Sequence, residues 1–309
     1  MREESEPGPL PEALEGDFVA VNLGCAGDPD PPLPKAWKAA LTVVEVDAAE
    51  PSRTTSRFHR RIALREPVAG KAGRYRFTRN TFSGSSSLLP PRGGMVEAYG
   101  MERYHKPAET VEVECRTLPE LLEENGIHRV DLLKTDLEGL DFEILRSMVP
   151  AFGEILALQM ELRFEPFYEG EPQFHEVVGF LAENGFELLD LEVERWKYKT
   201  RHRRWQLQGR AAWADVTFLL AAERIAEDPR LLAKQIALAR LLGKSNVAEF
   251  LLERHGAELP PGWRRDLESL IRSRSWSLAR GRQALRRWAR PALLWLKHRI
   301  RRSEHVALR

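Results

Sequence analysis

The sequence predicts an α/β protein built on a mostly parallel, doubly wound sheet. β-rich apolar runs alternate with short helical runs through residues 18–221, which is the spacing of βαβ units. Several runs are apolar without alternation, as strands buried on both faces are. The 309 residues, 43% hydrophobic and 30% charged, suffice for one large core with an appendage.

The first elements follow in close order. FVAVNLG (18–24) is a β-rich run that ends in glycine, and PKAWKAA (34–40) is a short helix candidate after a Pro-rich turn. LTVVEVD (41–47) is a buried-type strand that ends in an acid, and RIAL (61–64) is a third strand candidate. This succession predicts the first three strands of the sheet.

Residues 70–92 interrupt the alternation of strands and helices, because strand-forming aromatics are followed there by a Gly/Ser-rich loop. We interpret this stretch as an insertion. TVEVECR (110–116) then alternates as a strand does. The next run predicts a helix, with a capping box made by Thr117 and Glu120 and a stop at Asn125-Gly126.

The second half continues the alternation, and no internal repeat is found. It predicts strands at 130–136, 154–164, 186–193 and 213–221, and helices at 140–148 and 175–185. Two amphipathic helices follow within 228–256, and Pro260-Pro261-Gly262 reads as a linker. We therefore expect a disordered or loosely attached segment at 1–16, a main domain at 17–225 and a helical extension at 226–309.

Polar residues stand where several predicted strands end, and ligands of open parallel sheets bind outside the carboxyl ends of the strands. A first strand ending near Asn22 and Gly24, and a second ending in Asp47, fit a nucleoside-type cofactor. The glycine permits close approach of the backbone, and the acid can accept bonds from ribose hydroxyls. The alternative is that the glycine and the aspartate only form the turns at the ends of these strands. Residues 24–28 lack the GxGxxG spacing that binds a pyrophosphate, so a dinucleotide cofactor is disfavoured. S-adenosylmethionine has no pyrophosphate and therefore places fewer demands on the geometry of this turn.

The run VDLLKTDLEGLDFEIL (130–145) carries Lys134, Asp136 and Glu138 two residues apart, a spacing that puts strand side chains on one face. Two interpretations remain open at this point. Thr135 and Glu138 match a capping box, and Lys134 with Asp136 can form a simple ion pair. Alternatively, the charges belong to a site, since grouping them at a strand end costs desolvation unless a polar ligand is present.

The sequence gives little support to a metal site or to a serine hydrolase. The eight histidines show no H-x-x-H or H-E-x-x-H spacing, so no metal site is predicted. Ser85, Ser86 and Ser87 lack the G-x-S-x-G setting of a hydrolase and read as a polar loop. Two cysteines favour a reducing compartment. The acidic, Pro-rich N-terminus is unlike a signal peptide. No run reaches 18 apolar residues, and we expect a cytoplasmic protein.

Several stretches together resemble the FkbM family of S-adenosylmethionine-dependent methyltransferases. The central one is TLPELLEENGIHRVDLLKTDLEGLDFEILRSM (117–148). The others are VNLGCAGDPDPPLPKAWKAALTVVEVDAAE (21–50), SGSSSLLPP (83–91), ELRFEPFYEGEPQFHEVVGFLAENGFELLDL (161–191) and GRAAWADVTFLL (209–220). The resemblance covers about residues 17–222 in the right order. It implies a Rossmann-like methyltransferase fold, S-adenosylmethionine as cofactor, and methyl transfer to a hydroxyl of a saccharide, glycan or related metabolite.

The resemblance also implies roles for individual residues. The cofactor-binding residues it implies are Asn22, Gly24, Asp47, Ser86 and Asp136. The catalytic residues it implies are Lys134, Asp136 and Glu138, and the acceptor-binding residues are Glu161 and Tyr168. Asp136 or Glu138 would remove the hydroxyl proton, with Lys134 positioning the acid. For Glu161, a salt bridge to Arg163 is an equal alternative.

The first loop departs from the family pattern, which begins with Asp-x-Gly. Asn22 stands at the Asp position and lacks the negative charge that complements a sulfonium. A catalytically degenerate methyltransferase-fold module that binds a partner without turnover is therefore the alternative function.

The C-terminal tail has its own charge. Residues 262–309 hold 14 Lys and Arg against 3 Asp and Glu, a net charge of +11, so the preceding residues carry −10 of the total +1. An apolar stripe with interleaved arginines begins at Leu278 and ends at Trp295. Such a helix can lie on an anionic membrane at its inner face or contact a protein partner, or it can pack on its own domain. No recognition motif accompanies the charge, so nucleic acid is disfavoured.

Overall fold

A computed structural model of the protein describes residues 14–25, 40–48, 57–151, 153, 155–200 and 209–273. The short helix predicted at 34–40 and the apolar stripe of the basic tail lie outside these described residues. Leu14 is fully buried in the core. The prediction of a loose segment at 1–16 is therefore wrong at its C-terminal end, because a leucine there reaches the hydrophobic interior.

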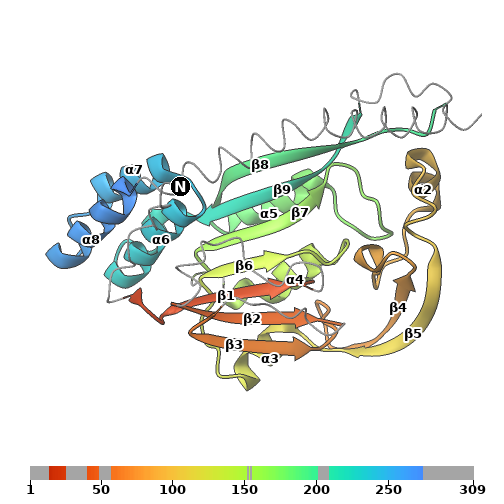
Figure 1. The fold of residues 1–309 in the computed structure, drawn as a ribbon, viewed down its shortest axis with the longest axis horizontal. Coiled ribbons are helices and arrows are strands. Elements are labelled where there is room, and N and C mark those ends of the chain that lie inside the picture. The colour runs from red at the N-terminus through yellow and green to blue at the C-terminus, as the bar shows by residue number, and fades with distance from the viewer. Residues whose placement is uncertain are drawn as a thin grey trace, which may run out of the picture.

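The centre of the fold is a seven-stranded sheet with the order β3-β2-β1-β6-β7-β9-β8 (Figure 1). Its strands are β1 (Phe18–Leu23), β2 (Leu41–Asp47), β3 (Arg60–Arg65), β6 (Leu132–Thr135), β7 (Ala157–Arg163), β8 (Phe186–Trp196) and β9 (Arg210–Leu220). Neighbours are parallel from β3 to β7, and β9 is antiparallel to both β7 and β8. The predicted mostly parallel sheet is confirmed, with β9 as its reversed strand.

Short helices connect the parallel strands. They are α3 (Leu118–Glu124), α4 (Asp141–Ser147) and α5 (Phe174–Glu183), with 3-10 turns η3 (Val149–Ala151) and η5 (Ala222–Arg224). The capping box predicted for α3 is confirmed: the Glu120 amide donates to Thr117 Oγ1 at 3.4 Å, and the Thr117 amide donates to Glu120 Oε2 at 3.0 Å. Each bond satisfies an amide that the first helical turn leaves free.

The capping box at Thr135 and Glu138, one of the two interpretations left open by the sequence, is absent. Helix α4 begins at Asp141 with Leu140 as its N-cap, whereas Thr135 still belongs to β6. Glu138 has a φ of 51° and Gly139 a φ of 98°, so the chain passes through the left-handed region before the helix starts. This turn leaves the Glu138 carboxylate available for other contacts.

The predicted insertion is a small unit beyond the carboxyl ends of the parallel strands (Figure 1). Strand β4 (Gly73–Asn80) pairs antiparallel with β5 (Pro107–Cys115) in a separate two-stranded sheet. The 3-10 turn η2 (Ser83–Ser85) and helix α2 (Gly93–Tyr99) lie between them in the chain. The insertion therefore stands at the edge where a ligand of the sheet is expected.

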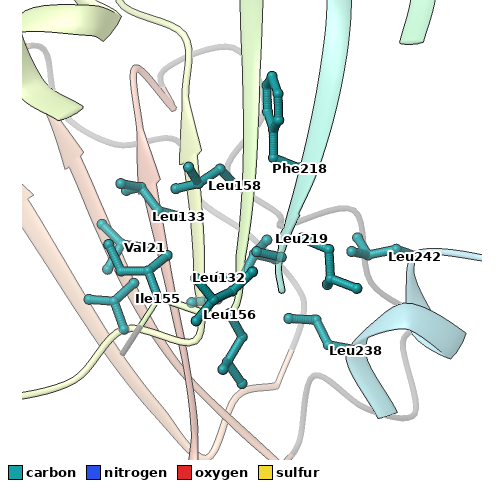
Figure 2. Packing of buried hydrophobic residues seen from close by; sticks show 14 of the residues in the cluster. Val21, Leu132, Leu133, Ile155, Leu156, Leu158, Phe218, Leu219, Leu238 and Leu242 are labelled. Atoms are coloured by element: carbon teal, nitrogen blue, oxygen red, sulfur yellow. The ribbon is translucent and has the colours of Figure 1, made fainter. Parts of the chain in front are cut away.

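Three helices gather at the opposite end: α6 (Pro229–Leu241), α7 (Ser245–His255) and α8 (Pro261–Arg272). The first two were predicted, but the linker predicted at Pro260–Gly262 is wrong. Pro261 opens α8, a position that tolerates proline because its amide has no helical partner, and Leu267 and Leu270 are buried. Figure 2 shows Leu238 and Leu242 of this extension beside Leu219 of β9, in one continuous core.

A buried ion cluster, made of Lys234, Asp131 and Asp17, attaches α6 to the start of the sheet. Lys234 and Asp131 have fully buried side chains, and Lys234 Nζ lies 3.1 Å from both carboxylate oxygens of Asp131. The same Nζ donates to the Asp17 carbonyl at 2.6 Å and lies 3.0 Å from Asp17 Oδ2. Buried charges persist only when paired and hydrogen-bonded in this way, so the helical extension is an integral part of the domain.

Within the described part of the chain, no helix combines the length and the apolar character that a membrane span requires.

Candidate active site

A cavity of about 320 Å³ opens between the β4–β5 unit and the carboxyl ends of the sheet strands. Its walls are mainly aromatic, with Phe82, Tyr99, Tyr104, His105, Phe167, Tyr168, Trp196 and Trp213. Its charged lining is Glu138, Glu161, Arg163 and Glu165. We call it the aromatic cavity. Apolar walls with a few convergent polar groups are the usual make-up of a small-molecule site.

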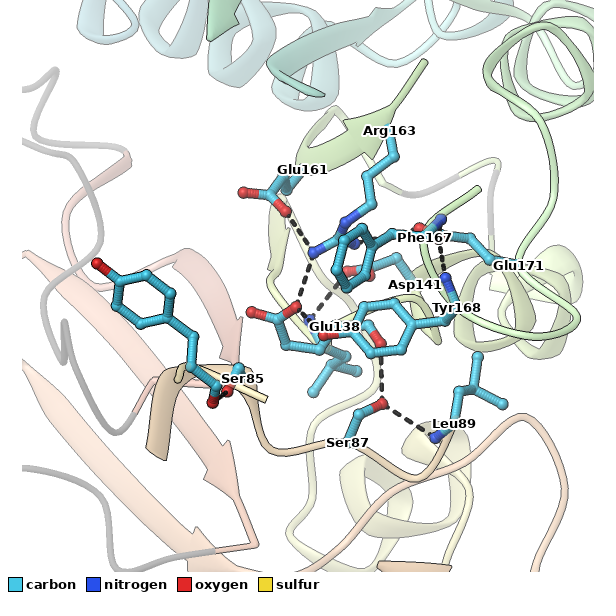
Figure 3. Close-up of polar contacts among 12 residues, drawn as sticks. Ser85, Ser87, Leu89, Glu138, Asp141, Glu161, Arg163, Phe167, Tyr168 and Glu171 are labelled. Atoms are coloured by element: carbon cyan, nitrogen blue, oxygen red, sulfur yellow. Dashed lines mark hydrogen bonds and ion pairs between the residues drawn. The ribbon is translucent and has the colours of Figure 1, made fainter. Parts of the chain in front are cut away.

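The charged lining is organised by one guanidinium (Figure 3). Arg163 Nη2 lies 2.7 Å from Glu138 Oε2 and 2.8 Å from Glu161 Oε1, and Arg163 Nη1 lies 3.1 Å from Glu171 Oε1. We call these four residues the arginine cluster. A guanidinium presents its donors in a fixed plane, so it sets where each carboxylate sits.

Local structure explains how these side chains meet. Glu161 and Arg163 are two residues apart on β7 and so share one face of the sheet. Glu171 belongs to the loop after β7, where its Oε2 accepts the amides of Phe167 and Tyr168 at 2.7 and 3.0 Å. These bonds fold the loop back onto Arg163 and place the Tyr168 ring 5.0 Å from the guanidinium.

Besides Arg163, two hydroxyl groups hold Glu138. The Tyr168 hydroxyl donates to its Oε2 at 2.7 Å, and the Ser87 hydroxyl donates to its carbonyl oxygen at 2.9 Å. Among the described residues it is the one non-glycine with positive φ. That conformation is unfavourable for a side chain with a Cβ, and such strain concentrates at functional sites. The turn points the carboxylate into the aromatic cavity.

Burial dominates the electrostatics of the cluster. It raises the pKa of Glu161 to about 8, with Asp136, Glu138 and Asp141 adding to the effect and Arg163 opposing it. Burial likewise raises the pKa of Glu138. Although burial disfavours the guanidinium, the surrounding carboxylates hold the pKa of Arg163 above its ordinary value. The site thus contains one carboxyl group, that of Glu161, that exchanges its proton near neutral pH.

A pH-dependent contribution to stability follows from Glu161. Its pKa rises from 4.5 in a free carboxyl group to about 8 in the fold, so the native state holds the extra proton between these values. The stabilising contribution is complete below about pH 4.5 and is lost as the pH rises through about 8. In urea unfolding at pH 5 and pH 8.5, the wild type should lose more stability than Glu161→Gln. Glu169→Gln, an exposed neighbour on the loop, is the control; parallel losses in wild type and Glu161→Gln contradict the assignment.

The expected cofactor residues lie at the switch point of the sheet, where β1 has β2 on one side and β6 on the other. The Gly24 amide donates to the Val46 carbonyl at 3.0 Å, and the Asp136 amide donates to the Leu23 carbonyl at 3.2 Å. Gly24 has a φ of 72°, and a Cβ there would lie 2.0 Å from the Asp136 carbonyl oxygen. The glycine is therefore required by the close approach of the β6 backbone.

The other predicted residues occupy distinct places. Asp47 ends β2 half-buried, and Asp136 is exposed just beyond β6. Asn22 is fully buried within β1, next in register to the half-buried Lys134. The interpretation of Lys134, Asp136 and Glu138 as one strand face is wrong, because β6 ends at Thr135 and the chain turns.

The structure brings Glu138, Glu161 and Tyr168 together, while Lys134 and Asp136 do not line the aromatic cavity. Ser86 Oγ accepts the Asn80 amide at 3.1 Å, and its two neighbours are closer to the site. Ser85 lines the cavity and Ser87 bonds Glu138. The salt bridge between Glu161 and Arg163, one of the two alternatives for Glu161, is present at 2.8 Å.

Sequence reasoning missed the central role of Arg163 and the aromatic walls. The alternation Glu161-x-Arg163 at a strand end was a usable signal, because it places both charges on one face. No comparable signal joins Tyr99, Trp196 and Trp213, which come from α2, β8 and β9. In the described part of the chain, no group of three or more His, Cys, Asp or Glu side chains is arranged to hold a metal ion.

The family model described as the methyltransferase FkbM domain matches residues 17–188, which is more than half of the chain. The chain belongs to the FkbM methyltransferase family. The family generally uses S-adenosylmethionine, in keeping with a candidate site at the switch point of a mostly parallel sheet.

Other comparisons add little to the FkbM assignment. No curated protein matches the chain. A crystal structure from Streptococcus pneumoniae, provisionally described as a tRNA (m1A22) methyltransferase, matches with 10% identity over 82% of this chain and 92% of that one. The TM-score is 0.29, and a likeness at that level supports no argument about substrate. In this chain, the FkbM match ends inside β8. It therefore leaves out β9, which lies between β7 and β8 in the sheet.

Proposed function

We propose that this FkbM protein transfers a methyl group from S-adenosylmethionine to a hydroxyl oxygen of a saccharide, glycan or related metabolite. The observation that carries the proposal is the aromatic cavity, because the strained Glu138 points a carboxylate into it beside Tyr168 and Arg163. The family supplies the reaction class, and the site suggests the acceptor class.

The residues at the switch point fit the cofactor. Gly24 brings the end of β1 against Asp136, and Asp47 stands at the end of the neighbouring β2 as an acceptor for ribose hydroxyls. Asn22 is buried in the sheet, so the acids that remain to balance a sulfonium are the more accessible Asp47 and Asp136. When bound, S-adenosylmethionine supplies an electrophilic methyl group.

The aromatic cavity suits the acceptor. The C–H groups on the face of a sugar ring carry slight positive charge, which the negative faces of aromatic rings attract. Carboxylates at the end of the cavity can accept bonds from sugar hydroxyls. A cavity of about 320 Å³ has room for a saccharide ring, and enclosing that ring removes water from the reacting hydroxyl.

Within this arrangement, Glu138 is the general base that removes the hydroxyl proton. Burial raises the pKa of Glu138, and a carboxylate with a raised pKa is a stronger base. Arg163 and Tyr168 orient its carboxylate, and Glu161 contacts the acceptor. Asp136 lies near enough to raise the pKa of Glu138. Burial raises the pKa of Asp215, and Lys134 partly offsets this rise, so Lys134 supplies positive charge near that carboxylate.

Calorimetric titration of the full-length chain with S-adenosylmethionine tests the proposal. We expect binding, and we expect Asp47→Asn to weaken it by about tenfold, because one charged hydrogen bond is worth about 1.5 kcal/mol. Asp266→Asn on the exposed side of α8 is the matched control and should bind normally. A folded protein that binds no cofactor would refute the enzyme proposal and favour the degenerate binding module that Asn22 suggests.

A further inference from the structure

The aromatic cavity is unbalanced in charge. Three carboxylates share the single guanidinium of Arg163. Those of Glu138 and Glu161 line the cavity, whereas Glu171 contacts Arg163 from outside the lining. Glu165 also lines the cavity, where Arg210 at the rim pairs with it. With every carboxyl group ionised, the arginine cluster carries a surplus of two negative charges. Burying unbalanced charge is costly, so the cavity favours either protons or a cation.

The walls add to the preference for a cation. The rings of Trp196 and Trp213 lie 5.4 Å apart at 39°, and both line the cavity. Aromatic faces attract cations, and more strongly where water is excluded. Burial lowers the pKa of His105 to about 4, so this lining residue stays neutral and adds no repulsion. Apart from Arg163, the described lining holds no basic side chain.

Two carboxylates stand where one small molecule can touch both. Glu138 Oε2 and Glu161 Oε1 contact the same nitrogen of Arg163, at 2.7 and 2.8 Å, and are therefore close together. In a small cyclic ligand, two polar groups on neighbouring ring atoms have a similar separation. One carboxylate can receive a hydroxyl while the other receives a charged group beside it.

We propose that the acceptor is an amino alcohol of the amino-sugar type, with its ammonium group against Glu161 and the reacting hydroxyl against Glu138. This deepens, and rests on, the methyl transfer proposed above. The ammonium offsets one of the two surplus negative charges of the arginine cluster, and the sugar face packs on the aromatic walls. An acceptor with a carboxylate or phosphate in this position is repelled by the cluster.

The same geometry couples binding of the acceptor to the release of a proton. An ammonium beside Glu161 favours its ionised form, so a proton leaves the site when an amino sugar binds. The groups that face Glu161 are Arg163 on its own strand, Asp215 opposite it on β9, and Asp136, Glu138 and Asp141 from the β6–α4 turn. Of these groups, only Arg163 favours the ionised form of Glu161 and so opposes its protonation. The released proton is therefore measurable near neutral pH, where Glu161 is partly protonated.

Three monosaccharides of the same ring provide the test: D-glucosamine, D-glucose and D-glucuronate. Their binding to the full-length protein is measured by saturation-transfer NMR titration at pH 7, without cofactor. We expect glucosamine to bind about tenfold more tightly than glucose, the equivalent of about 1.4 kcal/mol, and glucuronate to bind most weakly. Glu161→Gln should reduce glucosamine to the level of glucose. Glu169→Gln, which keeps the arginine cluster intact, should leave the preference unchanged.

Proton release is the second measurement. Calorimetric heats of glucosamine binding, in phosphate and in Tris at pH 7, should differ for the wild type and agree for Glu161→Gln. Equal binding of the three sugars, tighter binding of glucuronate, or no sugar binding at all would overturn this proposal. Neither measurement involves methyl transfer, so the cofactor titration can fail or succeed independently of it.

Discussion

Lys234→Met should lower the free energy of unfolding by about 3–5 kcal/mol, the largest effect expected from one substitution in this chain. Methionine fills the space of the lysine stem but leaves the fully buried Asp131 carboxylate without its ammonium partner. The lost donor also served the Asp17 carbonyl at 2.6 Å. Urea unfolding of the full-length protein, followed by circular dichroism at pH 7, measures the change.

Two variants make this prediction specific. Adding Asp131→Asn to Lys234→Met removes the stranded charge and keeps an acceptor for the Val19 amide, which Asp131 Oδ2 binds at 2.8 Å. The double variant should recover much of the stability. Arg254→Met breaks an exposed pair with Glu223 in the same extension and should cost about 1 kcal/mol or less. If Lys234→Met and Arg254→Met cost the same, the ion cluster does not attach α6 to the sheet.

Glu138→Gln should reduce kcat by about 10²–10⁴-fold while cofactor affinity stays nearly unchanged. The amide keeps the size of the carboxylate and can still accept a bond from the Tyr168 hydroxyl, but it cannot take a proton. Methyl transfer at saturating S-adenosylmethionine, together with calorimetric binding, measures the two quantities separately. The pH dependence of kcat should lose its rising limb in the same variant, since that limb reports ionisation of the base.

Two further carboxyl variants complete this test. Glu143→Gln on the exposed side of α4 is the matched control and should leave kcat intact. Asp136→Asn examines the other acid that the sequence offered as base. If Glu138→Gln retains the wild-type rate while Asp136→Asn loses it, the base is Asp136, and the strained turn at Glu138 serves only to hold the arginine cluster.

The sequence predicted the parallel part of the fold because each of its elements is locally encoded. The strand at 41–47 is continuously apolar, and the helix after Thr117 carries its own capping box. Helix α8 was missed because Pro260 and Pro261 indicate a break, whereas Pro261 is tolerated at a first helical position. The capping box considered for Thr135 and Glu138 is absent, because a Thr and a Glu three residues apart do not determine where helix α4 starts.

The site was less predictable than the fold. Glu138, Glu161 and Tyr168 were found through their places in a family pattern, and the first two also stand at or just past strand ends. The contacts among them pass through Arg163, whose partners Glu171 and Glu138 are 8 and 25 residues away in the chain. The aromatic walls come from elements separated by about a hundred residues, as the bond from Trp196 Nε1 to the Tyr99 carbonyl shows. Long-range packing of this kind leaves no periodic trace in a single sequence.

The buried ion cluster also sets the order in which the protein can assemble during synthesis. Asp17 leaves the ribosome 217 residues before its partner Lys234, and β9 must arrive before β7 and β8 can be joined. Until then the nascent chain carries an open strand edge and two aspartates without their ammonium. Domains made from the N-terminus onward usually fold as units, but this one can close only after α6 has emerged. Its early strands therefore depend on protection against aggregation for most of the time that the ribosome spends on the chain.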